Sequence, residues 1–352
     1  MQSGHIMKKV AIITGISGQD GIYLSRFLLK NNYEVHGIVR GKNNFDKYRL
    51  KMFNSDEINS INFHEADLVD YESLEKVFKK IRPTEIYNLG AQTVPELCEK
   101  SPDYTFDVNA LGVERLCKII YTNRLSARLF QAGSILQLCS DDSAKIKPTE
   151  VYKLSKDMAY NYIKYYREKY GLFALNGFLS NHESPFRNEY SLSKKIVKGI
   201  INVLLYGGYM KLYNLDYKRE WGHAKDYAGA IWLALNGQKP KDVIISTNKF
   251  YSIREFCELV CKSLDVDIIW QEKGREIVGI DSQNKRVLIK GLKKDPSIDE
   301  RGTIVKENFT KLLMPKPIRD IKYLVREMVL CELELLSDGY SLDLKKDTIF
   351  SP

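Results

Sequence analysis

Two side chains four residues apart, Tyr152 and Lys156, have the types and spacing for acid–base chemistry. Positions i and i+4 share one face of a helix, so the ammonium of Lys156 can lie near the hydroxyl of Tyr152. That positive charge favours the phenolate and lowers a pKa that is about 10 for an isolated tyrosine. The pair therefore predicts a general base that works near neutral pH.

The position of the pair in the chain singles it out, because the sequence contains four Tyr-x3-Lys pairs. Only this pair begins a predicted helix, 149–170, that follows a predicted strand, 127–134. Ser134 ends that strand, where its hydroxyl can hydrogen-bond a substrate hydroxyl or a developing carbonyl oxygen. We therefore predict Ser134, Tyr152 and Lys156 as catalytic residues; the alternative is an ordinary surface Tyr and Lys.

The beginning of the chain predicts a dinucleotide site. A buried strand over Val10–Thr14 runs into Gly15, Gly18 and Gly21, and a helical pattern follows. Glycines at such a turn let the backbone approach a pyrophosphate closely and direct a helix N-terminus at it. The Gly-x2-Gly-x2-Gly spacing resembles the fingerprint of extended short-chain dehydrogenase/reductases; a purely structural turn is the alternative.

The elements that position these residues alternate regularly. Further strands are predicted at 33–40, 62–68 and 85–92, with helices at 70–81 and 104–123. Strands that alternate with helices indicate an α/β fold with a doubly wound parallel (Rossmann) sheet, whose ligands bind at the carboxyl ends of the strands.

The alternation breaks near residue 186, which predicts a smaller C-terminal substrate lobe. We expect a dinucleotide-binding domain over 7–185, with its sheet completed by about 212–250, and an interleaved lobe over 186–337. Within the lobe, Ser252 and Glu255 have the spacing of a helix capping box.

The sequence after the second strand bears on the choice of cofactor. An acidic residue there binds the ribose hydroxyl of NAD, whereas Arg40-Gly41-Lys42 favours the 2′-phosphate of NADP. We predict NADP, with NAD as the alternative. The expected cofactor-binding residues are Gly15, Gly18, Gln19, Asp20, Gly21, Arg40, Asp67, Leu68, Leu89, Ala91, Tyr152 and Lys156.

The amino-acid composition limits the classes of binding partner that we expect. The net charge of +9 comes from Lys and Arg that are scattered among 45 acidic residues, which argues against nucleic acid and suits an anionic small substrate. The six cysteines have no metal-ligand or disulfide spacing, so no metal is expected. We expect a cytoplasmic protein without membrane segments, and Met1–Ile6 are typical of a tag remnant.

Four longer stretches, at 13–21, 34–40, 181–185 and 218–227, make the chain from Ala11 to about Val305 resemble the GDP-mannose 4,6-dehydratase family. The resemblance implies a GDP-linked sugar as substrate and a homodimer or homotetramer. It also implies contacts to GDP from Asn181, Lys195, Arg219 and Arg301. Guanidinium and ammonium donors suit a diphosphate.

One departure from the family concerns the chemistry. The family's Ser-Thr-Ser-Glu, whose glutamate handles a proton during loss of water, becomes Gly133-Ser134-Ile135-Leu136. An alkyl side chain cannot take a proton, so we expect oxidation at C4 of the sugar with dehydration lost or weak. A second family glutamate is replaced by Ile304.

Other interpretations stay open at this point. A dehydratase can recruit Glu150, Asp141 or Asp142 as the missing acid/base. A C4 epimerase or reductase would pass through the same 4-ketone. A non-catalytic binding protein with a degenerate dehydrogenase fold is the alternative from another class.

Overall fold

The computed structural model describes residues 8–41, 55–138, 150–292, 310–314, 319–337 and 350–351. The tag-like Met1–Ile6, as well as Asp141, Asp142, Arg301 and Ile304, lie outside these residues. The chain forms two compact units. The first contains the described parts of Met1–Ser180, Ala224–Ser246 and Thr303–Met314, and the second those of Asn181–His223, Thr247–Gly302 and Pro315–Pro352.

The first unit is built on an eight-stranded sheet in the order β16-β11-β6-β5-β4-β1-β2-β3. All neighbouring strands pair in parallel. The strands are β1 (Val10–Thr14), β2 (Glu34–Val39), β3 (Ile61–Glu65), β4 (Glu85–Asn88), β5 (Arg128–Ser134), β6 (Ala174–Leu179), β11 (Val243–Ser246) and β16 (Thr310–Leu313). The predicted parallel Rossmann sheet is confirmed.

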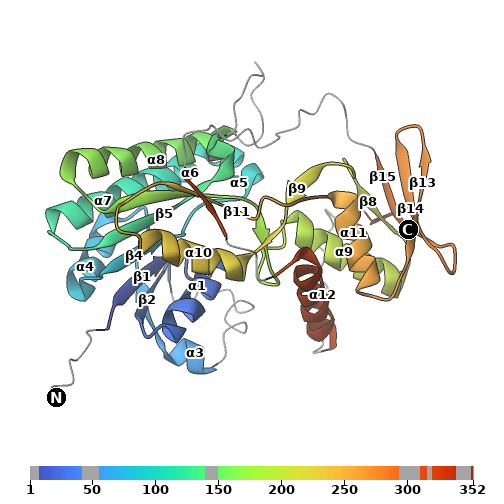
Figure 1. The fold of residues 1–352 in the computed structure, drawn as a ribbon, viewed down its shortest axis with the longest axis horizontal. Coiled ribbons are helices and arrows are strands. Elements are labelled where there is room, and N and C mark those ends of the chain that lie inside the picture. Colours follow the sequence, from blue (N-terminus) through green and yellow to red (C-terminus); the bar gives the residue numbers. More distant parts are fainter. Residues whose placement is uncertain are drawn as a thin grey trace. The chain divides into compact units, whose positions relative to one another are not determined.

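Helices cover both faces of this sheet (Figure 1). On one face lie α4 (Tyr71–Ile81), α7 (Gly112–Thr122) and α8 (Glu150–Tyr170), and on the other α1 (Gln19–Lys30) and α10 (Ala224–Leu235). The shorter helices are α3 (Ser55–Asn59), α5 (Pro95–Lys100), α6 (Pro102–Phe106), the π-helical turn η2 (Asp107–Leu111) and the 3₁₀ turn η3 (Ile135–Leu138). The apolar faces of α4, α7 and α8 form one core with the sheet, which holds the carboxyl ends of the strands in place.

The predicted helix over 104–123 is interrupted. Its middle turn, η2, widens around Asn109, whose Oδ1 accepts from the backbone N of Gln92 at 2.8 Å. Its Nδ2 donates to Gln92 O and to Ser155 Oγ, at 3.0 Å each. These tertiary bonds favour the wider turn, because they hold the Asn109 side chain against the segment after β4. The predicted strand over 85–92 is shorter in the structure: β4 ends at Asn88, and the backbone N and O of Gln92 are bonded to the Asn109 side chain.

Two histidines stack on neighbouring strands near the β3 edge of the sheet. Nδ1 of His36 lies 2.9 Å from Nε2 of His64, and Nε2 of His36 lies 3.0 Å from a carboxylate oxygen of Glu34. Burial lowers the pKa of both imidazoles, and for His64 the charges of His36 and Lys80 act in the same direction.

The second unit packs three helices, α9 (Leu192–Tyr206), α11 (Ile253–Lys262) and α12 (Ile321–Ser337), around a common core. Its larger sheet has the order β13-β14-β15-β8-β17. The strands of the unit are β7 (His182–Glu183), β8 (Tyr209–Leu212), β9 (Lys218–Glu220), β10 (Gly222–His223), β12 (Phe250–Ser252), β13 (Ile268–Lys273), β14 (Glu276–Asp281), β15 (Val287–Leu292) and β17 (Phe350–Ser351).

The predicted capping box at the start of α11 is present. Ser252 Oγ accepts from Glu255 N at 3.0 Å, and the Glu255 carboxylate accepts from Ser252 N at 2.6 Å. Two otherwise orphaned donors of the helix end are satisfied in this way. None of the helices in the described ranges is long and apolar enough to span a bilayer.

Candidate functional site

The turn between β1 and α1 requires glycine for geometric reasons. Gly15 has φ of +66°, and a Cβ there would lie 2.7 Å from the backbone N of Gly90. A Cβ on Gly21 would lie 2.5 Å from Gly15 O. Gly18 N donates to Gly15 O at 2.9 Å, which closes the turn. The first amides of a helix are left unpaired by the helix itself, so this turn fits a pyrophosphate at the N-terminus of α1.

The ends of β4 and of the segment after β3 lie close to this turn. Leu68 is buried, and its Cδ1 lies 3.0 Å from the point where Gly90 would carry a Cβ. Leu89 and Ala91, on either side of Gly90, are half-buried. Leu68 and Gly90 therefore lie beside each other, next to the glycine turn.

The polar residues predicted for the cofactor have local partners. Asp67 Oδ1 accepts from Val69 N at 3.3 Å, and Gln19 Nε2 donates to Asp20 Oδ1 at 3.2 Å. Arg40 is exposed at the end of β2, and its Nη1 donates to Tyr104 OH at 2.8 Å. The guanidinium is thus held at the edge where the adenosine ribose of a dinucleotide binds in this type of fold.

Helix α8 brings Tyr152 and Lys156 together as their spacing predicts. Tyr152 is half-buried in the first turn, and the Lys156 ammonium lies 5.8 Å from the centre of the Tyr152 ring. Lys156 is buried, and its Nζ donates to the backbone O of Ala132 in β5 at 2.8 Å. The helix and the strand that carries Ser134 are therefore linked at the lysine.

The environment of Lys156 disfavours its charge. Burial lowers the pKa of its ammonium to about 8, while Cys98 and Asp20 act in the opposite direction. Its ammonium donates to a neutral acceptor, the backbone carbonyl of Ala132. A phenolate at Tyr152 would add an anionic partner close to this buried cation.

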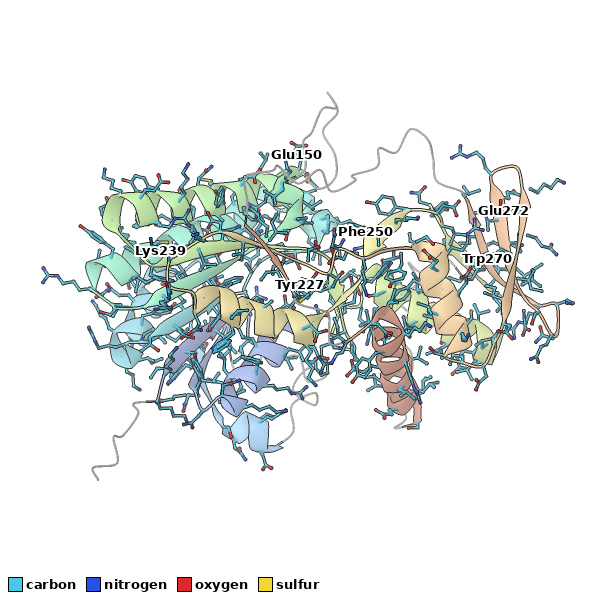
Figure 2. The ribbon with its side chains drawn as sticks, viewed as in Figure 1. Glu150, Tyr227, Lys239, Phe250, Trp270 and Glu272 are labelled. Atoms are coloured by element: carbon cyan, nitrogen blue, oxygen red, sulfur yellow. The ribbon has the colours of Figure 1, made fainter. Side chains whose placement is uncertain are left out.

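Ser134 lies at the carboxyl end of β5, directly before the turn η3. Its Oγ accepts from Leu136 N at 3.3 Å, and its own backbone N donates to Gln137 Oε1 at 2.8 Å. Leu136 is half-buried in this turn and offers only an alkyl side chain. Glu150 begins α8, two residues before Tyr152 (Figure 2).

A row of buried polar side chains crosses the sheet beneath the site, and sequence reasoning missed it. Thr14 Oγ1 donates to Asn88 Oδ1 at 2.5 Å, and Asn88 Nδ2 donates to Gln131 Oε1 at 2.6 Å. Gln131 Nε2 then donates at 3.0 Å to Ala132 O, the oxygen that also accepts from Lys156. One sequence signal was present: a polar residue near the end of each of three apolar strands.

In the second unit, Asn181 comes directly before one paired strand and Arg219 lies within another. Asn181 O accepts from Gly222 N at 3.1 Å, next to the parallel pair β7 and β10. Arg219 lies on β9 with its guanidinium 4.9 Å from the Trp221 ring centre. Lys195 is half-buried in the first turn of α9, and Arg301 lies outside the described residues.

The surroundings of Arg219 fit an anionic ligand. Among the described residues its Nε is buried and has no hydrogen-bond partner. Burial lowers the pKa of the guanidinium; Glu183 opposes this, and Arg187 adds to it. Glu183 is buried as well, ion-paired with Arg187 Nε at 3.1 Å and hydrogen-bonded by Ser193 Oγ at 2.6 Å. An anionic oxygen would satisfy the orphaned donor.

The described residues contain no group of three or more His, Cys, Asp or Glu placed to hold a metal ion. The donors at the glycine turn and at Arg219 are instead suited to phosphate oxygens, which is the chemistry of a dinucleotide and a nucleotide sugar.

Comparison with known proteins gives consistent matches. The family described as GDP-mannose 4,6 dehydratase matches residues 12–328. The human protein named GDP-mannose 4,6 dehydratase is 36% identical over 94% of this chain and 92% of its own length. The Vibrio cholerae protein named GDP-mannose 4,6-dehydratase is 38% identical over 78% of this chain and 77% of its own.

Solved structures match the fold. A UDP-glucose 4-epimerase from Thermotoga maritima, solved with UDP-glucose, has a TM-score of 0.72 at 17% identity and covers 93% of this chain and 99% of its own. A dTDP-glucose 4,6-dehydratase from Bacillus anthracis in complex with NAD has a TM-score of 0.69 at 17% identity, with 93% and 97% covered.

Proposed function

Because this chain belongs to the GDP-mannose 4,6-dehydratase family, we propose that it oxidises C4 of a GDP-linked sugar to the 4-ketone, with dehydration lost or weak. It is an enzyme of the short-chain dehydrogenase type. The observation that carries the proposal is the buried ammonium of Lys156, 5.8 Å from the Tyr152 ring at the carboxyl edge of the sheet.

In the proposed reaction, Tyr152 as phenolate takes the proton of the C4 hydroxyl while the C4–H bond breaks. Lys156 stabilises the phenolate before this step, and Ser134 Oγ donates a hydrogen bond to the oxygen that becomes the carbonyl. A nicotinamide cofactor, held by the glycine turn, supplies the hydride acceptor when it is bound. The products are the 4-keto sugar nucleotide and the reduced cofactor.

Leu136 is the reason to separate oxidation from dehydration. Loss of water across C5 and C6 needs a further acid/base, and such a group typically contributes about 10²–10⁴ in rate. The half-buried alkyl side chain of Leu136, the second residue of η3, cannot act in that way.

The test is incubation of the enzyme with GDP-mannose and with a GDP-heptose. Absorbance of reduced nicotinamide and the mass of the sugar product are followed together. We expect a product lighter by two hydrogens, with reduced cofactor in equal amount. A rapid product lighter by one water, carrying a 6-methyl group, would refute the loss of dehydration.

A working dehydratase is the second candidate, because Glu150 places a carboxyl group in the first turn of α8, two residues before Tyr152. In that case Glu150→Gln abolishes loss of water while C4 oxidation continues. An epimerase or reductase would instead return the hydride to C4. The intact Tyr152 and Lys156 argue against the non-catalytic alternative.

We propose NADP as the cofactor, with NAD as the alternative. Arg40, exposed and hydrogen-bonded to Tyr104, is available to a 2′-phosphate. Mass measurement of cofactor released from the protein distinguishes the two. Weaker binding of NADP, but not of NAD, in Arg40→Ala would support the role of this residue.

We also propose GDP contacts from Asn181, Lys195, Arg219 and Arg301, as the family resemblance implies. Within the described ranges the buried Nε of Arg219 has no hydrogen-bond partner, which supports its part. Arg219→Lys keeps the charge but removes the planar donor pair, so we expect at least a tenfold higher KM for the GDP-sugar with unchanged cofactor affinity.

A homodimer or homotetramer remains our proposal for the assembly. Leu154, Met158 and Tyr165 are exposed along one side of α8, at spacings of four and seven residues. Light scattering after gel filtration gives the mass, and Met158→Glu should lower it. An unchanged mass in this variant would show that α8 is not the contact.

A further inference from the structure

One glutamine side chain joins the end of β5 to the catalytic helix. Gln137 is the third residue of the turn η3, and its amide has bonds at both ends. Its Oε1 accepts from the backbone N of Ser134 at 2.8 Å. Its Nε2 donates to the backbone O of Lys156 at 2.8 Å and to Asp157 Oδ1 at 3.3 Å.

The adjoining glycine leaves the space that this amide occupies. A Cβ on Gly133 would lie 2.6 Å from Gln137 Oε1 and would also clash with the fully buried side chain of Asn176. Both contacts are too close for carbon, so residue 133 has to be glycine while Gln137 holds its present position. Gly133 and Gln137 therefore form one arrangement, and neither was predicted as a functional residue.

The hydrogen bonds of Gln137 use both the oxygen and the nitrogen of its side-chain amide. The strand offers a donor, Ser134 N–H, and the helix offers acceptors, Lys156 O and the Asp157 carboxylate. A carboxylate at residue 137 could accept from the strand but would repel the helix acceptors. An alkyl side chain could do neither.

We propose that Gln137 is a positioning residue, which holds Ser134 at a fixed place relative to the helix that carries Tyr152 and Lys156. The inference builds on the proposed function, since Ser134 and Tyr152 have to meet the same C4 oxygen. A misplacement of about 1 Å between reacting groups can cost about 10²-fold in rate.

The first test is Gln137→Met, which keeps the length of the side chain and removes both kinds of bond. We expect kcat for 4-ketone formation to fall by about 10- to 100-fold. KM for the GDP-sugar and the affinity for cofactor should stay within about twofold, because Arg219 and the glycine turn keep their contacts. Gln271→Met, the same change at an exposed residue of β13, serves as the control and should leave kcat unchanged.

Gln137→Glu is the second test and gives a signature that a general loss of stability would not. When ionised, its carboxylate repels the Asp157 carboxylate; when protonated, its hydroxyl donates again to the helix. The neighbouring carboxylate raises the pKa of the new acid. We therefore expect kcat of Gln137→Glu, divided by the wild-type value at the same pH, to be near one at low pH and to fall progressively as pH rises. For Gln137→Met this ratio should not change with pH.

Hydrogen exchange at the backbone amide of Ser134 reports on its hydrogen bond to Gln137 without requiring enzymatic turnover. Exchange should be faster in Gln137→Met and close to wild type in Gln137→Glu, which retains the acceptor. If the wild type forms no keto product with any GDP-sugar, the proposed function fails, and the exchange result still decides whether Gln137 holds Ser134. Unchanged kcat with unchanged exchange in Gln137→Met, or a Gln137→Glu profile parallel to wild type, would overturn the inference.

Discussion

Replacing Lys156 by methionine should slow the reaction and stabilise the fold at the same time. The rate effect comes from losing the charge beside Tyr152. At 5.8 Å between the ammonium and the ring centre, an effective dielectric constant of about 20 gives an attraction of about 3 kcal/mol to the phenolate. Without it the phenolate is harder to form, so hydride transfer at pH 7 should fall by about 100-fold.

The stability effect has the opposite sign, because burial of the ammonium is costly. The lowering of its pKa from 10.5 to about 8, at about 1.4 kcal/mol per pKa unit, corresponds to about 3 kcal/mol. Below about pH 8 the folded and unfolded states both bind the proton, so wild type carries the whole cost. Above it the folded state releases the proton first, and the cost disappears as pH rises towards 10.5. Ala132 O keeps one donor in the variant, Gln131 Nε2 at 3.0 Å.

The assay combines denaturant unfolding from pH 7 to 10 with single-turnover formation of reduced nicotinamide. We expect Lys156→Met to exceed wild type in free energy of unfolding at pH 7, and the difference between the two curves to shrink steadily as pH rises to 10. Lys164→Met, at an exposed lysine of the same helix, controls for general effects of charge. Parallel stability curves, or a variant as active as wild type at pH 7, would refute the reasoning.

Three further predictions concern other parts of the first unit. Leu136→Glu should add loss of water to the reaction and raise the rate of formation of the 6-deoxy product by about 10²-fold or more. Mass spectrometry of the sugar product measures this rate, with Leu136→Gln as the control, and equal products from the two variants would contradict the prediction. Gly15→Ala should weaken cofactor binding at least tenfold in a calorimetric titration, because φ of +66° and the 2.7 Å approach to Gly90 N both exclude a Cβ; unchanged affinity would count against the glycine-turn site. Acidification below the ordinary histidine pKa of 6.5 should destabilise the fold, since the unfolded chain then binds protons that the buried His36 and the half-buried His64 exclude. Unfolding curves at pH 7 and pH 5 should differ less in the His36→Phe/His64→Phe double variant, and an equal difference would argue against the pair.

The sequence predicted the elements whose signals are local. Strands such as Val10–Thr14 are short apolar runs bounded by turn residues, and the Ser252–Glu255 box needs only neighbours along the chain. The placing of Tyr152 in the first turn of α8 follows in the same way, since it depends on where one helix begins.

The features that the sequence did not predict depend on residues far apart in the chain. The wide turn at Asn109 is favoured by bonds to Gln92 and Ser155, which no local pattern contains. The same holds for the buried pair Lys194 and Glu332, whose lysine also donates to Pro185 O at 2.9 Å. Both sets of partners become neighbours only after the sheet and the helices have packed.

The chain passes back and forth between the two units, and this limits what recombination between related genes can exchange. Each unit is assembled from three separate stretches, with boundaries near Ser180, His223, Ser246, Gly302 and Met314. No single crossover between two related genes can therefore take one whole unit from one parent and the other whole unit from the second parent. New substrate preferences in this architecture should accumulate by point substitution at the binding surfaces, and not by exchange of a whole lobe.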